Sequence, residues 1–174
     1  MNVCYTVEAK SRNDLRVFSN MLRRKLRLEN EIKIPIIELL DIFCEVFESF
    51  SYEIVPDDEL PCDIHAETDV LSCHIKIKES VYDGACDGNG RDRMTIAHEI
   101  GHALMLCCYG FKLQLHRNFS GGEIKPYNDP EWQAKCFAGE FMVNYELTKN
   151  MTPEQIAISC GISLEAARYQ YNHR

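Results

Sequence analysis

The sequence predicts an α+β fold that is mostly helical, with a small, mainly antiparallel sheet beside the helix that carries residues 98–102. Two patterns support this: several segments repeat apolar residues at helical spacing, and residues 73–78 alternate between apolar and polar side chains. The length of 174 residues and the hydrophobic content of 45% are those of one globular domain with its own core. We expect a single domain over residues 1–174, with helices in 1–50, the sheet and two central helices in 51–145, and a helical hairpin in 146–174.

Two helices are predicted in the first fifty residues. Residues 11–28 repeat apolar side chains at helical spacing, and Ser11 with Asp14 matches the capping-box pattern at a helix start. Pro35 suits the first position of a second helix, whose apolar face continues to Phe50. We assign both helices to the core.

The net charge of −8 is distributed unevenly along the chain. Residues 10–28 contain seven basic residues against Asp14 alone, a local charge of +6, so the remainder sums to −14. An acidic body disfavours nonspecific binding to nucleic acid, so no nucleic-acid partner is expected. The basic segment is interpreted as a solvated helix face, with a docking face as the alternative.

Nine cysteines are scattered through the chain without a Cys-x-x-Cys pair, which is typical of free thiols in a reducing cytoplasm. The first residues lack the basic and apolar regions of a secretory signal, and no apolar run reaches membrane-spanning length. We therefore expect a cytoplasmic protein without a membrane partner.

Two strands are expected before the central helices. The first is short, Tyr52 to Val55, and the second covers Cys73 to Lys78. The alternation in the second strand places Cys73, Ile75 and Ile77 inward and His74, Lys76 and Lys78 outward. Residues 83–90 are rich in Gly and Asp, but Arg91 and Asp92 break the register of a calcium-binding loop, so this segment is expected to be a mobile loop.

His98-Glu99-Ile100-Gly101-His102 is the most informative motif in the chain. Residues four apart share a helix face, so His98 and His102 can offer two imidazole nitrogens to one metal ion. Glu99 directly follows His98, so its side chain is turned away from the face that carries the two histidines. There it can act on a metal-bound water without binding the metal. This is the pattern of a zinc peptidase, in a helix expected to begin at Arg93 or Thr95 and to end near Cys108. The alternative is a helix that carries two histidines without a metal.

Zinc needs a third protein ligand, and Glu131 is the favoured candidate. Asp129 suits an N-cap and Pro130 a first helical position, so Glu131 lies in the first turn of a helix. Small residues at 134 and 138 allow this helix to approach the histidines closely. The alternative role of Glu131 is to stabilise the helix dipole. The other candidate ligands are Glu123, His116, Asp129 and Glu140.

Two segments resemble the ImmA/IrrE family of metallopeptidases: residues 91–102 and residues 131–138, which fit the family pattern E-x-x-A-x-x-F-A. The resemblance covers mainly residues 70–145. It implies a zincin-like minimal core of gluzincin type, with His98, His102 and Glu131 as zinc ligands and Glu99 as catalytic base. It also implies cleavage of helix-turn-helix repressors in mobile elements, phages or stress responses. The chain departs from the family at Lys135, where Asn is usual, and at Met142-Val143-Asn144, where Leu-Met-Pro is usual.

The predicted activity is that of a zinc endopeptidase that holds one Zn²⁺ per chain and cleaves a specific intracellular regulator, a repressor-like or antitoxin-like protein. Glu99 would take the proton of the attacking water, and His116, Tyr127 or Tyr109 would stabilise the oxyanion. The strand at 73–78 is expected to be an edge strand that holds the substrate backbone.

The C-terminal tail allows one further interpretation. Thr152 and Ser163 suit helix starts and Gly161 a turn, so the tail resembles a helix-turn-helix. Its second helix carries few basic residues, which favours a packing hairpin over a DNA reader. The alternatives to an endopeptidase are thus a zinc-containing binding or sensor module with little peptidase activity, and a small DNA-binding regulator that acts through this tail.

Overall fold

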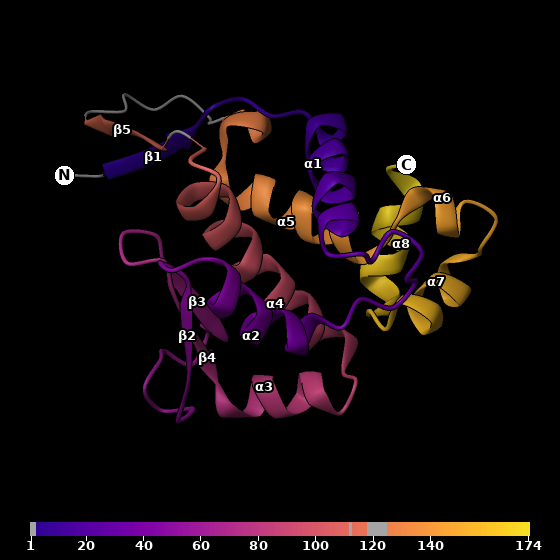
Figure 1. Cartoon of the computed structure of the whole chain (residues 1–174), viewed down its shortest axis with the longest axis horizontal. Helices are drawn as coiled ribbons and strands as arrows, with labels where there is room; N and C mark the ends of the chain where they lie inside the picture. The colour runs from indigo at the N-terminus through magenta and orange to yellow at the C-terminus, as the bar shows by residue number, and fades with distance from the viewer. Residues whose placement is uncertain (1–2, 112, 118–124) are drawn as a thin grey trace.

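The computed structural model describes residues 3–111, 113–117 and 125–174, with the backbone alone for 3–5 and 113–117. Within these residues the fold is α+β and mostly helical, as the sequence predicts (Figure 1). The α-helices are α1 (Arg12–Lys25), α2 (Ile36–Val46), α3 (Glu79–Cys86), α4 (Gly90–His102), α5 (Pro130–Met142), α6 (Tyr145–Thr148), α7 (Pro153–Cys160) and α8 (Leu164–Asn172). A π-helix, η1 (Ala103–Cys108), continues α4, and a 3-10 helix, η2 (Pro126–Asn128), precedes α5. No helix in these residues is both long and apolar enough to cross a membrane.

The strands form two separate units. A three-stranded sheet has the order β2 (Ser51–Val55), β4 (His74–Lys78), β3 (Ala66–Asp69), and β1 (Val3–Val7) pairs with β5 (Leu113–Arg117) in a two-stranded ribbon. β2 pairs with β4 in parallel, whereas β3–β4 and β1–β5 are antiparallel. The three-stranded sheet is therefore mixed, with one parallel and one antiparallel pairing, and not mainly antiparallel as expected, because β2 runs in the same direction as β4.

The prediction that the strand at 73–78 is an edge strand is wrong. β4 is the central strand, bonded to β2 on one side and to β3 on the other, so its backbone groups are already paired. Among the described strands of this sheet β2 and β3 lie at the edges, and the sequence analysis missed β3 because Ala66-Glu67-Thr68-Asp69 is short and mostly polar. Lys78 is also buried, not outward, and its Nζ donates a hydrogen bond of 2.8 Å to the Pro61 carbonyl.

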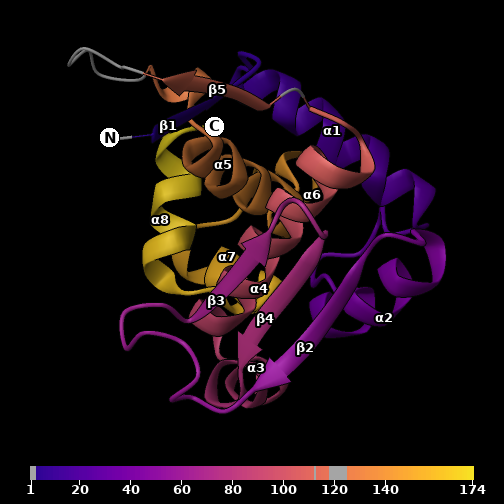
Figure 2. The same cartoon turned by 90° about the vertical axis from the view of Figure 1, so that its left-hand side faces the viewer.

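Helix α4 occupies the centre of the molecule, with the three-stranded sheet on one side and α5 on the other (Figures 1 and 2). Its apolar side is completely buried, which is why the helix can lie inside the core. The helix begins three residues before the earliest predicted start, because the Asn89 side chain caps it by accepting bonds from the Arg91 and Asp92 amides. It ends as an α-helix at His102, and the predicted remainder to Cys108 is the π-helix.

Helix α5 starts as the sequence predicts, and it packs directly against α4. The Asp129 carboxylate caps it by accepting a 2.9 Å bond from the Glu131 amide, and Pro130 is its first residue. The two helices approach closely at Gly101, where a Cβ would lie 2.8 Å from a ring carbon of Phe137 and 3.5 Å from the Ala134 carbonyl oxygen. A larger residue at 101 would separate the helices.

Two other segments differ from expectation. Residues 83–86 belong to α3 and not to a loop, because Val81 and Ala85 lie in the core and hold the segment as a helix. The turn comes later, at Gly88, whose φ of +88° suits glycine. Pro35 is the residue before α2 and not the first residue within it.

The C-terminal residues form the predicted packing hairpin. Gly161 joins α7 to α8 with a φ of +64°, and its carbonyl accepts a 2.9 Å bond from Nε of Arg93 in α4. The hairpin backbone passes so close to Gly90 that a Cβ there would collide with the backbone of Ile162 and Ser163. The hairpin is therefore fixed to the first half of α4.

The basic residues of α1 do not form a simple solvated face. Arg12 and Arg16 bind the buried Glu140 of α5 at 2.8 and 2.7 Å, and Arg23 is completely buried. The Nε of Arg23 donates to the Phe141 carbonyl at 2.9 Å. Arg12, Arg16 and Arg23 therefore fasten α1 to α5, whereas Arg24, Lys25 and Arg27 are exposed to solvent.

Substitution of Gly101 tests the close approach of α4 and α5. Val is no worse than Gly in helix propensity, so propensity alone predicts no loss of stability for Gly101→Val. The contact with Phe137 instead predicts a fall of about 1–3 kcal/mol in the free energy of unfolding, because the core cannot expand freely. Chemical denaturation followed by circular dichroism measures the difference, and a variant as stable as the wild type would refute the packing argument.

Candidate metal centre

Three side chains from two helices converge on one point. His98 and His102 lie one helical turn apart on α4, and their Nε2 atoms are 3.1 Å apart. The carboxylate of Glu131, in the first turn of α5, lies between them, with Oε1 3.1 Å from His102 Nε2 and Oε2 3.3 Å from His98 Nε2. These three residues form a group that can hold a metal ion.

The spacing of these atoms matches a tetrahedral metal site. With zinc–ligand bonds of about 2.0–2.1 Å, two ligands at a tetrahedral angle lie about 3.3–3.4 Å apart. The two histidine Nε2 atoms, 3.1 Å apart, are within a few tenths of an ångström of that value, and each faces one oxygen of Glu131, Oε1 at 3.1 Å for His102 and Oε2 at 3.3 Å for His98. The donor set therefore fits a metal ion in both chemistry and geometry.

The site is closed on the protein side and open towards solvent. The side chains of His98 and His102 are 17% and 10% exposed, whereas that of Glu131 is 59% exposed. An open fourth position is what separates catalytic from structural zinc sites. The arrangement thus leaves room for a water molecule or a substrate atom.

Hydrogen bonds to the two imidazoles hold the pKa of Glu131 well below its usual range. The bond to His102 is the largest cause, followed by that to His98, and together they outweigh the opposing effect of burial. Glu131 is therefore a carboxylate at neutral pH, the form in which it can bind a cation.

Glu99 lies beside this group but points to a different partner. Its Oε1 is 4.0 Å from His98 Nε2, and its Oε2 accepts a 2.7 Å hydrogen bond from the Thr68 hydroxyl. Burial raises the pKa of Glu99, while His98 and the Thr68 bond oppose that rise. The carboxylate is thus close to the converging ligands and held in place from β3.

Thr68 is the site residue that the sequence analysis missed. It lies on β3 and contacts Glu99 twice, because its hydroxyl oxygen is also 3.2 Å from the Glu99 carbonyl oxygen. A lone Thr in a polar tetrapeptide gives no sequence signal, and only the pairing of β3 with β4 brings it to α4.

A cavity of about 660 Å³ lies in front of the three ligands. We call it the β3 cavity, because Ile64 and residues 66–71 form one wall of it and His98, Glu99, His102, Leu106, Pro130 and Glu131 line the rest. Among the described strands, β3 is paired on one side only. The cavity therefore places an unpaired strand edge next to the candidate ligands.

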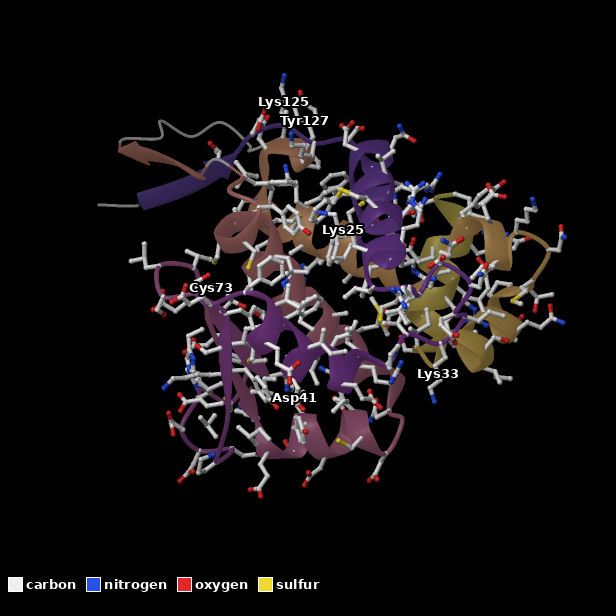
Figure 3. The ribbon with its side chains drawn as sticks, in the orientation of Figure 1. Lys25, Lys33, Asp41, Cys73, Lys125 and Tyr127 are labelled. Carbon is white, nitrogen blue, oxygen red and sulfur yellow. The ribbon has the colours of Figure 1, made fainter. Side chains whose placement is uncertain are left out.

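The other candidate residues are not brought to this cavity. Tyr127 is exposed and lies beside Lys125 at the periphery of the molecule (Figure 3). Tyr109 packs its ring edge-on against Phe18, with 5.0 Å between ring centroids. The side chain of His116 lies outside the described residues, as does all of Glu123.

The remaining alternatives to Glu131 have other partners. Asp129 caps α5, and Glu140 is buried against Arg12 and Arg16. Among the candidate third ligands that the structure describes, Glu131 alone joins the two histidines.

The cysteines whose side chains the structure describes do not contribute to the candidate centre. The eight whose side chains are described are free thiols, in agreement with the sequence analysis. Cys107 and Cys108 lie in η1, directly after α4, and the Sγ of Cys108 lies 3.9 Å from that of Cys73. Burial raises the pKa of both Cys107 and Cys108 to about 12, and neither thiol belongs to the group of converging side chains.

Removal of any one ligand is expected to weaken metal binding. Loss of even an indirect partner of a zinc ligand costs 10–100-fold in affinity, so His98→Ala, His102→Ala or Glu131→Ala should each cost at least about 100-fold. Competition with a zinc-binding dye measures the affinity. His74→Ala is the control, because His74 pairs with Glu53 on the sheet, away from the site. Zinc affinity unchanged in Glu131→Ala would exclude it as a ligand.

Comparisons of the chain with protein-family models, with curated proteins and with solved structures find no match. The assignment of the candidate centre is therefore supported by its geometry alone. That geometry consists of three converging ligand atoms, a buried carboxylate beside them and an open cavity with a strand edge.

Proposed function

We propose that this protein is a zinc-dependent endopeptidase with one Zn²⁺ per chain. The observation that carries the proposal is the position of Glu99. A carboxylate held 4.0 Å from a candidate ligand, but directed elsewhere by Thr68, is placed to act on a water and not to bind the metal. A purely structural metal site has no use for such a group.

Zinc is the metal that we propose for this donor set. Two imidazoles and one carboxylate with an open position form a recurrent ligand set of catalytic zinc. When bound, zinc supplies a Lewis acid that activates water at neutral pH and polarises a carbonyl group. His98, His102 and Glu131 would hold it.

Glu99 supplies the proton transfers of the proposed reaction. As a carboxylate it accepts a proton from the attacking water, and it then donates that proton to the nitrogen of the leaving amine. Burial raises the pKa of Glu99, which favours binding of the proton. The hydrogen bond from the Thr68 hydroxyl lowers that pKa and so stabilises the carboxylate form. Both steps need the carboxylate in one fixed orientation, which the contact with β3 provides.

The edge of β3 is the proposed binding site for the substrate backbone. An extended peptide can add to an unpaired strand edge through backbone hydrogen bonds, which fix the chain without selecting its sequence. The β3 cavity lies between that edge and the ligands. A peptide on β3 would thus present its carbonyl groups to the candidate centre. This role replaces the one that the sequence analysis gave to residues 73–78.

The proposed substrate class depends on the resemblance of residues 91–102 and 131–138 to the ImmA/IrrE family. On that basis we propose that the substrate is a cytoplasmic regulatory protein of the helix-turn-helix repressor or antitoxin-like kind. The narrow choice of substrate would come from contacts outside the centre, because backbone pairing carries no sequence preference.

Glu99→Gln is expected to abolish peptide hydrolysis while the protein still binds zinc. A general base contributes about 10²–10⁴-fold to a rate, and Gln keeps the shape of the side chain without the proton acceptor. Purified protein with one zinc per chain is incubated with a cell extract, and new peptide N-termini are counted by mass spectrometry.

The comparison of wild type and Glu99→Gln at equal zinc content separates the functional candidates. New N-termini with wild type only would support the proposal. The same N-termini with both proteins would contradict the role of Glu99. An absence of new N-termini with either, at full zinc content, would favour the binding or sensor module.

Thr68→Val is expected to shift the pH dependence of hydrolysis. The Thr68 bond lowers the pKa of Glu99, so its loss raises that pKa, and the acidic limb of the pH–rate profile moves to higher pH. A hydrogen bond to a charged group contributes about 1.5–3 kcal/mol, which corresponds to a shift of about one pH unit or more. Thr68→Ser, which keeps the hydroxyl, is the control and should retain the wild-type limb.

A further inference from the structure

A second cavity, of about 540 Å³, lies on the other side of His98. We call it the α8 cavity, because helices α4, α5 and α8 form its walls. Met94, Trp132, Ala166 and Tyr169 are the principal apolar side chains that line it. Its volume lies within the range of about 300–1,000 Å³ that is typical of ligand pockets.

His98 lines both the α8 cavity and the β3 cavity, so both hollows border a residue of the candidate metal centre. Trp132, which directly follows Glu131, forms part of the α8 cavity and is half-buried there. A peptide chain that crosses the centre from the edge of β3 would therefore pass the mouth of the α8 cavity.

We infer that the α8 cavity binds a bulky apolar side chain of the substrate next to the bond that is cut, and that Ala166 and Tyr169 set the size of that side chain. The inference rests on the proposed endopeptidase function and gives it a substrate preference. It also gives the C-terminal hairpin a role, as one wall of the substrate site.

The charges around the cavity support an apolar occupant. Arg91 and Lys135 bring two cations and Glu165 one carboxylate, and all three residues are exposed. Because the charges are mixed, the cavity attracts neither an anionic nor a cationic side chain strongly. Burial of an apolar side chain against the apolar walls is favourable, because it removes both surfaces from water. An aliphatic or aromatic side chain thus matches the cavity better than a charged one.

The α8 wall is fixed before any substrate binds. Gln170 of α8 is buried, accepts a 3.0 Å hydrogen bond from Arg12, and packs where Gly139 of α5 leaves no room for a Cβ. The bond from Arg93 to the Gly161 carbonyl holds the turn of the hairpin. Because α8 is held by both α4 and α5, this wall resists deformation. It can therefore distinguish substrate side chains by their size.

The inference is tested with hydroxamates on the zinc-loaded protein. Acetohydroxamic acid probes the metal centre alone, and two longer hydroxamates that differ only in a benzyl group or a hydrogen probe the α8 cavity. The wild type should bind the benzyl compound about 10–200-fold more tightly than its unsubstituted analogue, the discrimination that an apolar pocket provides. Titration calorimetry gives the three dissociation constants.

Two variants should change this ratio in a defined way. Ala166→Trp fills the cavity and should reduce the preference for the benzyl compound at least about 10-fold. Tyr169→Ala widens the cavity. Compared with the wild type, this variant should bind a naphthylmethyl hydroxamate more tightly relative to the benzyl hydroxamate. Ile158→Trp is the control: it places the same indole side chain on α7, at a position that is 82% exposed and outside the cavity, and should leave all ratios unchanged.

The possible failures are distinguishable. If acetohydroxamic acid does not bind the zinc-loaded protein, the metal centre lacks an open position, and both the proposed function and the inference fail. If acetohydroxamic acid binds but the wild type shows no preference for the benzyl group, the inference alone is wrong. A preference that neither Ala166→Trp nor Tyr169→Ala alters would also overturn it.

Discussion

The close approach of α4 and α5 is the contact on which the candidate metal centre depends. Two histidines one turn apart on α4 make only part of a site, and the third ligand must come from another helix. Gly101 on α4 and Ala134 on α5 are small enough for the two helices to meet there, and this places Glu131 3.1 Å from His102. Because Phe137 fills the same contact and is completely buried, the helices cannot slide without disturbing the core.

The rest of the fold holds those two helices in place and surrounds them with binding surfaces. Buried charge fixes α1 to α5, since Glu140 binds both Arg12 and Arg16. On the sheet side, β3 brings Thr68 to Glu99 and offers an unpaired edge among the described strands. On the opposite side of His98, the hairpin α7–α8 closes a second cavity. One helix therefore connects the ligands, the candidate base and both cavities.

The sequence predicted the parts of the site that depend on local rules. The spacing of His98 and His102 follows from helix geometry, and the start of α5 follows from Asp129 and Pro130, so the position of Glu131 could be predicted. The edge strand could not be, because β3 is four mostly polar residues that become a strand only by pairing with β4. For the same reason Thr68 was missed. The α8 cavity depends on tertiary packing between residues about seventy positions apart, such as Met94 and Ala166, and leaves no local pattern.

X-ray absorption at the zinc edge of the purified protein tests the central claim most directly, because it reports the ligand atoms of the bound metal without a substrate. The account predicts one zinc per chain with nitrogen and oxygen ligands at about 2.0–2.1 Å, including the scattering pattern of two imidazoles. Sulfur ligands at about 2.3 Å would place the metal on cysteines such as Cys107 and Cys108 and contradict the account. Failure of the protein to retain zinc would contradict it equally.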